Sequence, residues 1–336
     1  MGEGDACHKC RRKGWQYNVA AGCTNCHQAS SFLTINDAFF NMRNLISLIL
    51  FSLCAGLAGC SSVPEPESTS QMGNLLLAEP APVSPRSQMA IARYNQILTS
   101  PKLTDEERAE LHYHRGMLYD SVGLTGLAQF DYSQALQLKP DFAEAYNSIG
   151  IHFIQQQEFI QAYEAFDSTL DIDPEYDFAF LNRGIALYYG DRADLATDDL
   201  ATFYQQDDSD PFRALWVYFA RQQHNPEQAS IKLEQAKQTI EADHWAITLI
   251  DLFLGQASEA DLLSKLIEGV STQQALTERL CEAYFYLGKY HANHGNNGKA
   301  ANYFKLALST NVFDYVEYRY ARLELDMLRQ PQDAVN

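Results

Sequence analysis

The sequence repeats itself with a period of 34 residues, and this repetition limits the fold more than any other feature. Gly116, Gly150 and Gly184 mark three successive copies. Each copy has a large side chain four residues before the glycine (His112, Tyr146 and Phe180) and an alanine twelve residues after it (Ala128, Ala162 and Ala196). The first two copies also share an aromatic residue (Tyr132 and Phe166) and a closing proline (Pro140 and Pro174). Small residues allow the two helices of a hairpin to cross closely, and proline ends a helix. The pattern therefore predicts an all-α chain of stacked helical hairpins.

The order of these residue types resembles the tetratricopeptide repeat (TPR), which implies a TPR-type α-solenoid. We expect repeats at residues 109–142, 143–176, 177–210 and 281–314. The last copy carries the same residue types at Tyr284, Leu287, Gly288, Ala300, Phe304 and Ala307, with Val312 in place of the proline. Less regular helices are predicted at 212–221, 228–240, 249–254 and 262–267, with flanking helices at 88–100 and 314–329. Together these elements define a TPR-like domain over residues 88–330.

Short polar residues predict where several helices begin. Thr104 with Glu107, and Asp141 with Glu144, have the spacing of a capping box. Asp-Pro at 210–211 and Asn-Pro at 225–226 predict helix starts, because proline is tolerated in the first turn and the residue before it can cap.

An apolar segment ahead of this domain has the features of a lipoprotein signal peptide. Arg43 precedes a run from Leu45 to Leu57 that is too short to span a bilayer as a helix. The run ends in Leu-Ala-Gly followed by Cys60, which resembles a bacterial lipobox. We therefore expect residues 42–59 to be a signal peptide, Cys60 to carry the lipid, and the proline-rich residues 60–87 to be a disordered linker.

Residues 1–41 contain two CxxC pairs, at 7–10 and 23–26, and the second pair is followed by His27. This spacing suits a four-thiolate zinc site or a c-type haem attachment. A signal peptide, however, acts at a chain's N-terminus, and Met42 stands directly before the basic Arg43. We therefore favour a mis-assigned start, with 1–41 as a spurious extension, and expect no metal or cofactor.

The charge of the chain excludes some partners. The whole chain has a net charge of −18. Residues 1–59 carry five basic and three acidic side chains, a net charge of +2, so the residues from Cys60 onward carry −20. So acidic a surface repels phosphate backbones and anionic headgroups. We expect no nucleic-acid binding, and contact with a membrane only through the lipid anchor.

Four segments carry a closer resemblance: FLNRGIALYYGDRADLATDDL (180–200), DPFRALW (210–216), EAFDSTLDIDP (164–174) and YLGKY (286–290). They resemble the lipoprotein NlpI family of gamma-proteobacteria, and the resemblance runs over residues 42–330. It implies a homodimeric TPR lipoprotein on the periplasmic face of the outer membrane. Such proteins are adaptors that deliver peptidoglycan endopeptidases to a periplasmic C-terminal-processing protease and scaffold other murein enzymes, with effects on cell division and morphology.

Inner positions of the first helix of each TPR hairpin usually face the partner. Here the apolar and aromatic ones, which we predict to form a partner-binding groove, are Tyr113, Met117, Ile151, Ile154, Phe178, Leu181, Ile185, Tyr188 and Tyr189. No Lys or Arg occupies an inner position of the three repeats, which argues against recognition of a C-terminal carboxylate. All five inner residues of the third repeat are apolar or aromatic, so a partner segment, a second subunit or a terminal helix of this chain must cover them.

Candidates for catalysis are weak. His112/His114 and His291/His294 are the close histidine pairs, and no third metal ligand lies near them in the sequence. The sequence has no nucleophile-elbow, zinc-protease or phosphate-loop motif, and Cys281 lacks a His–Asn pattern. We predict a non-catalytic adaptor without catalytic residues; the alternative is an unrecognised envelope hydrolase that uses histidine and acidic residues.

Overall fold

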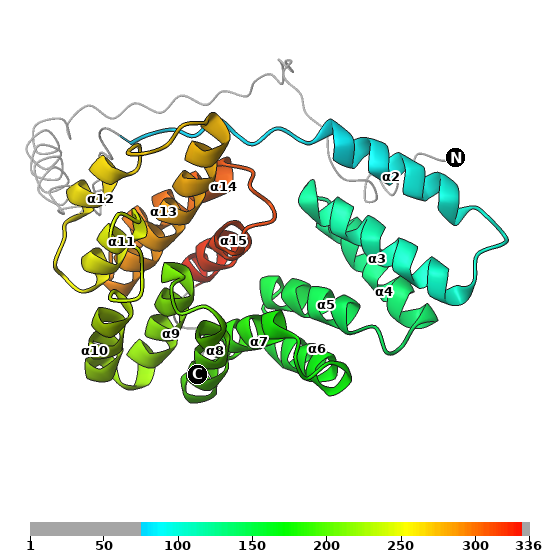
Figure 1. Ribbon diagram of the computed structural model, residues 1–336, viewed down its shortest axis with the longest axis horizontal. Helices are drawn as coiled ribbons and strands as arrows, with labels where there is room; N and C mark the ends of the chain where they lie inside the picture. Colours follow the sequence, from blue (N-terminus) through cyan, green and yellow to red (C-terminus); the bar gives the residue numbers. More distant parts are fainter. Residues whose placement is uncertain (1–74, 331–336) are drawn as a thin grey trace, which may run out of the picture. The chain divides into compact units, whose positions relative to one another are not determined.

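The computed structural model describes residues 75–330, and all regular structure within this range is α-helical (Figure 1). The helices are α2 (Pro85–Leu98), α3 (Asp105–Ser121), α4 (Thr125–Leu138), α5 (Ala143–Gln155), α6 (Phe159–Ile172), α7 (Asp177–Tyr189), α8 (Ala193–Gln206), α9 (Pro211–His224), α10 (Pro226–Ala236), α11 (Ala246–Phe253), α12 (Glu259–Lys265), α13 (Gln273–Asn293), α14 (Asn297–Ser309) and α15 (Val316–Arg329). This confirms the predicted all-α TPR-type solenoid.

The four predicted repeats are four helical hairpins: α3–α4, α5–α6, α7–α8 and α13–α14. In each hairpin the repeat glycine meets a large side chain of the second helix. A Cβ added at Gly116 would lie 2.6 Å from the Tyr132 ring, and one at Gly184 would lie 2.6 Å from Leu200. The glycine spacing found in the sequence therefore marks a close approach of the two helices in each hairpin.

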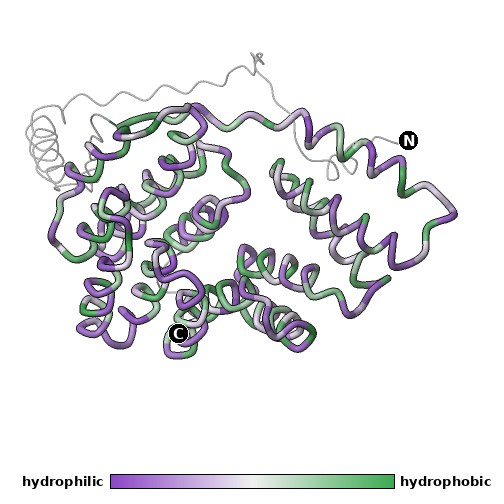
Figure 2. Tube along the Cα trace, in the orientation of Figure 1, coloured by the Kyte–Doolittle hydropathy of each residue, from purple (hydrophilic) through white to green (hydrophobic). Residues whose placement is uncertain are grey.

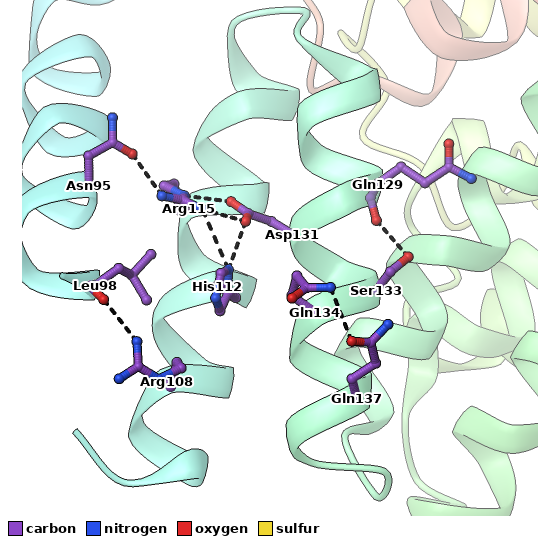
Figure 3. Close-up of polar contacts among 10 residues, drawn as sticks. All are labelled: Asn95, Leu98, Arg108, His112, Arg115, Gln129, Asp131, Ser133, Gln134 and Gln137. Atoms are coloured by element: carbon purple, nitrogen blue, oxygen red, sulfur yellow. Dashed lines mark hydrogen bonds and ion pairs between the residues drawn. The ribbon is translucent and has the colours of Figure 1, made fainter. Parts of the chain in front are cut away.

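Polar contacts strengthen the first hairpin (Figure 3). Arg115 of α3 donates two hydrogen bonds to the buried carboxylate of Asp131 on α4, at 2.7 and 2.6 Å, and His112 Nδ1 lies 2.8 Å from the same group. Burial opposes ionisation of Asp131, but the hydrogen bonds from Arg115 and His112 outweigh it and lower the pKa of Asp131. The third hairpin repeats this fork with Arg183 and Asp199.

Aromatic side chains fill the interior between the third and fourth repeats. Most helices alternate hydrophobic and hydrophilic residues along their length (Figure 2). Helix α9 buries most of its residues. Its Trp216 packs edge-on against Tyr188, and Phe219 packs against Phe253 of α11. Helices α9 to α12 thus continue the stack from α8 to α13, although their sequence does not follow the repeat.

The C-terminal helix α15 packs against α5, α13 and α14 (Figure 1). Glu324 of α15 accepts hydrogen bonds from Lys289 of α13 and from the Tyr189 hydroxyl of α7. The Lys289 ammonium also donates to the Tyr188 hydroxyl at 2.7 Å. This buried ion pair joins three distant parts of the sequence.

Residues 75–84, which we call the N-terminal strap, are docked on the domain, although the predicted disordered linker over 60–87 includes them. They run in extended form beside the fourth repeat (Figure 1). Leu75, Leu76 and Ala78 pack on the core. Tyr284 donates to the Leu76 carbonyl, Thr277 donates to the Glu79 carbonyl, and the Ala81 amide donates to Thr310. Apolar side chains among the prolines allow this part of the segment to dock.

Helix α2 follows the strap and begins at Pro85, three residues before the predicted start at 88. It buries no residue completely and is held to α3 by polar contacts. Arg108 donates to the Leu98 carbonyl at 2.8 Å, and Arg115 donates to the Asn95 side chain at 2.8 Å (Figure 3).

Most of the predicted capping residues are found at the starts of the observed helices. The Thr104–Glu107 capping box forms, and Asp210 and Asn225 cap α9 and α10. The predicted box from Asp141 to Glu144 is wrong: Phe142 occupies the cap position of α5, without a side-chain hydrogen bond.

Three predictions fall outside the described residues: the spurious extension over 1–41 with its CxxC pairs, the signal peptide over 42–59 and the lipidation of Cys60. Among residues 75–330, no helix combines the length and apolarity needed to cross a bilayer.

Candidate protein-binding groove

A groove of about 310 Å³ is formed by the first helices of the three consecutive repeats and by the chain entering α15. Its floor and walls are lined by Tyr113, Met117, Asp120, Tyr132, Asn147, Ser148, Ile151, Tyr176, Phe178, Leu181, Asn182, Asp314, Val316 and Arg319. Because α3, α5 and α7 are equivalent helices of successive hairpins, each contributes its inner face to the same concavity.

Five predicted site residues line this groove, namely Tyr113, Met117, Ile151, Phe178 and Leu181. Met117 is 46% exposed and Phe178 is 56% exposed, which is high for side chains of this size and polarity. Met117, Ile151 and Phe178 are called the apolar shelf below. Among the predicted inner positions, Met117 of the first repeat and Phe178 of the third therefore remain open.

The other four predicted residues, Ile154, Ile185, Tyr188 and Tyr189, do not belong to an open surface. All four are buried. Tyr189 packs against Tyr320 of α15 and Trp216 of α9, and its hydroxyl donates to Glu324. The prediction that these four residues line an open groove is therefore wrong. At Tyr189 of the third repeat, the chain's own C-terminal helix covers the side chain.

Sequence reasoning missed the residues that α15 and the preceding turn add to the groove. Asp314, Val316 and Arg319 line it, although they lie far from the repeats in the sequence. The inner positions of the repeats contain no cation, but Arg319 of α15 supplies one to the groove. The absence of Lys and Arg from those positions therefore does not exclude carboxylate recognition. The amphipathic pattern of 316–329 predicts a buried face but does not say which repeat receives it.

Two asparagines add polar capacity to the groove. Asn182 of α7 donates to the side-chain oxygen of Asn147 of α5 at 2.9 Å. This bond uses one donor of Asn182 and leaves the Asn147 amide donors for other partners. Side-chain amides at such positions suit hydrogen bonding to a peptide backbone.

The electrostatics of the groove are dominated by carboxylates. Asp120 accepts hydrogen bonds from Tyr132 at 2.8 Å and lies 3.0 Å from His152 Nε2. Burial first, and then the Asp120 charge, raise the pKa of Tyr132. Burial likewise raises the pKa of Tyr176 to about 12, with a smaller contribution from Glu144. The tyrosine hydroxyls therefore stay neutral at physiological pH, and the negative charge resides on the acids.

Among the candidates for catalysis, His112 and His291 pair with carboxylates and Cys281 is buried, whereas His114 and His294 are exposed. His112, His152 and His291 each pair with a carboxylate, and within residues 75–330 none of the three hydrogen-bonds a serine, threonine or cysteine. Cys281 lies inside α13 and is buried, and burial raises its pKa, which makes a reactive thiolate unfavourable. Among the described residues, no cluster of histidine, cysteine or acidic side chains could hold a metal ion.

The fold and the groove together define an all-α TPR-type solenoid protein. No protein-family model matches the chain. Among solved structures, the apo form of RapI is similar with a TM-score of 0.53 at 14% identity, over 72% of this chain and 94% of that one. A TPR protein from Parabacteroides merdae ATCC 43184 is similar with a TM-score of 0.45 at 15% identity, over 73% and 91%. At 14% identity, the similarity to RapI shows the fold alone.

Proposed function

We propose that this chain is a non-catalytic adaptor that binds other proteins through the groove of its first three repeats. The observation that carries the proposal is the apolar shelf, where Met117 and Phe178 stay exposed inside a concave, partly polar surface. Large apolar side chains that are exposed together in a concavity are typical of binding sites. The scaffold around them is fixed by buried contacts, so the site needs no folding of its own on binding.

The finer form of the proposal follows the resemblance to the NlpI family. We infer a homodimeric, lipid-anchored outer-membrane protein facing the periplasm. It would bring peptidoglycan endopeptidases and other murein enzymes to a C-terminal-processing protease and so regulate cell division and morphology. The segments at 164–174, 180–200 and 210–216 support this form.

Reconstitution with purified components tests the proposal. A C-terminal-processing protease and a murein endopeptidase are mixed with the full chain, and endopeptidase degradation is followed over time. The chain should accelerate degradation. Met117→Asp with Phe178→Asp should reduce this acceleration roughly ten-fold or more, because charges replace two central apolar contacts.

The matched control is Phe130→Asp on α4, since Phe130 is 58% exposed but does not line the groove. It should retain the full acceleration, and circular dichroism should show the same helicity for all variants. Full acceleration by the double groove variant would refute the groove as the adaptor site.

A further inference from the structure

The groove combines its apolar shelf with an uneven set of charges. Asp120 and Asp314 line it, and Glu144 lies close enough to raise the pKa of Tyr113 and Tyr176 on its wall. Arg319 is the cation among the lining residues. The two lining carboxylates against one guanidinium leave the groove net negative at neutral pH, and Glu144 beside it adds to this charge.

Asp314 is the carboxylate best placed to receive a partner. Unlike Asp120, which is occupied by Tyr132 and His152, Asp314 forms no ion pair or side-chain hydrogen bond within the described part of the chain. Partial desolvation raises the pKa of Asp314, Arg319 lowers it, and Asp120 raises it again. An added cation would relieve both the desolvation and the repulsion between the two acids.

Arg319 does not neutralise Asp314 through an ion pair. Its Nε donates to the Phe313 carbonyl at 3.2 Å, and it makes no ion pair with any residue in 75–330. A carboxylate bound to Arg319 would have to approach Asp120 and Asp314, which line the same small space. Like charges at such separations repel, so an acidic ligand is disfavoured relative to a basic one.

Resting on the proposed adaptor function, we propose that the groove selects a polypeptide segment in which a lysine or arginine adjoins an apolar side chain. The basic group lies beside Asp314 and Asp120, and the apolar side chain covers the shelf of Met117, Ile151 and Phe178. Asn147 and Asn182 are placed to hydrogen-bond the peptide backbone. The volume of about 310 Å³ is at the lower end for ligand sites, so it fits a few side chains of an extended segment.

Selection from a library of random dodecapeptides on the full chain tests this inference. Bound peptides should be enriched in lysine or arginine next to aliphatic or aromatic residues. For a selected peptide, fluorescence anisotropy should then show opposite effects of two substitutions. Asp314→Asn should weaken binding roughly two- to five-fold, and Arg319→Gln should strengthen it by a similar factor, because each changes a partly exposed charge pair.

Matched controls lie on α15, the helix that carries Arg319. Asp326→Asn and Arg329→Gln change exposed charges that pair with each other outside the groove, and both should leave affinity unchanged. Selection of acidic peptides, or weakening by Arg319→Gln with no loss in Asp314→Asn, would overturn the basic-segment inference while the groove remains a binding site.

Two other outcomes would go further. If no peptides are recovered, or if Met117→Asp with Phe178→Asp binds them fully, the proposed function fails with the inference. If the groove variants instead abolish self-association of the chain in sedimentation velocity, its occupant is a second copy, and the inference is overturned.

Discussion

At the scale of single residues, each repeat brings its glycine close to a large side chain sixteen positions later. Gly150 faces Phe166, and a Cβ there would lie 2.5 Å from the ring. Phe166 is fully buried, so it has no room to retreat. The glycine is therefore required by packing and not by an unusual backbone angle, since it lies inside α5.

Replacing Gly150 with alanine tests this contact. Although alanine favours helix, we expect Gly150→Ala to lower the free energy of unfolding by about 1–3 kcal/mol, because the buried ring must shift. Gly298→Ala in α14 is the control: its Cβ meets nothing within 4 Å, so the variant should be as stable as the parent or gain up to about 1 kcal/mol. Urea unfolding measures both; equal stabilities would argue against close packing at Gly150.

Glu259, the first residue of α12, gives a prediction about pH. It accepts hydrogen bonds from His291 at 3.0 Å, Lys299 at 2.6 Å and the Tyr303 hydroxyl. Burial alone would raise its pKa, but these donors outweigh burial and lower the pKa from 4.5 to about 2. A lowered pKa stabilises the fold above the unfolded value, and this contribution is lost as pH falls through the folded one.

The stability difference between the parent chain and Glu259→Gln should therefore be largest above about pH 4.5 and shrink towards pH 2. Urea unfolding of both proteins at several pH values measures it. The control is Glu268→Gln, whose exposed pair with Lys265 should contribute little at any pH. A difference that stays constant across this range would show that Glu259 acts by packing alone.

At the scale of elements, two segments outside the repeats decide which surfaces remain open. Helix α15 packs on Tyr189 of the third repeat, whereas the N-terminal strap holds the fourth repeat. The 34-residue pattern predicts the hairpins because each contact lies within one repeat. It cannot predict where α15 docks, because that depends on the Lys289–Glu324 pair, whose members belong to different, non-repeating positions.

The strap should loosen independently of the hairpins. Tyr284→Phe removes the hydroxyl that donates to the Leu76 carbonyl, and such a bond contributes about 0.5–1.5 kcal/mol. We expect faster hydrogen exchange at the Ala81 amide, which is bonded to Thr310 in the same strap. Amides of α7 should exchange at the parent rate. Unchanged protection at Ala81 would mean that Leu75 and Leu76 hold the strap through apolar contacts alone.

At the scale of the whole molecule, sequence reasoning predicted the class of fold and five of the residues that line the candidate groove. Tyr113, Met117, Ile151, Phe178 and Leu181 were found because a TPR helix presents its inner face at fixed positions. The charges that distinguish this groove, Asp314 and Arg319, come from a distant helix, and only tertiary packing brings them there. Partner class therefore depends on the part of the groove that the repeat does not encode.

The docked strap also sharpens the proposed attachment to a membrane. A free linker from Cys60 to residue 87 could extend about 90 Å, but the fifteen residues from Cys60 to Leu75 reach at most about 50 Å. The folded domain would then stay near the bilayer by its fourth-repeat end, since the strap begins there.

We therefore expect Cys60→Ser to move the protein from the membrane fraction to the soluble fraction of fractionated cells. Mass analysis of the parent protein should show a chain that begins at a Cys60 carrying diacylglycerol. Cys54→Ser, inside the same apolar run, is the matched control and should leave the protein in the membrane fraction. If Cys60→Ser stays membrane-bound while its mass shows a cleaved chain, attachment depends on protein contacts, and the short-tether argument fails with the lipid.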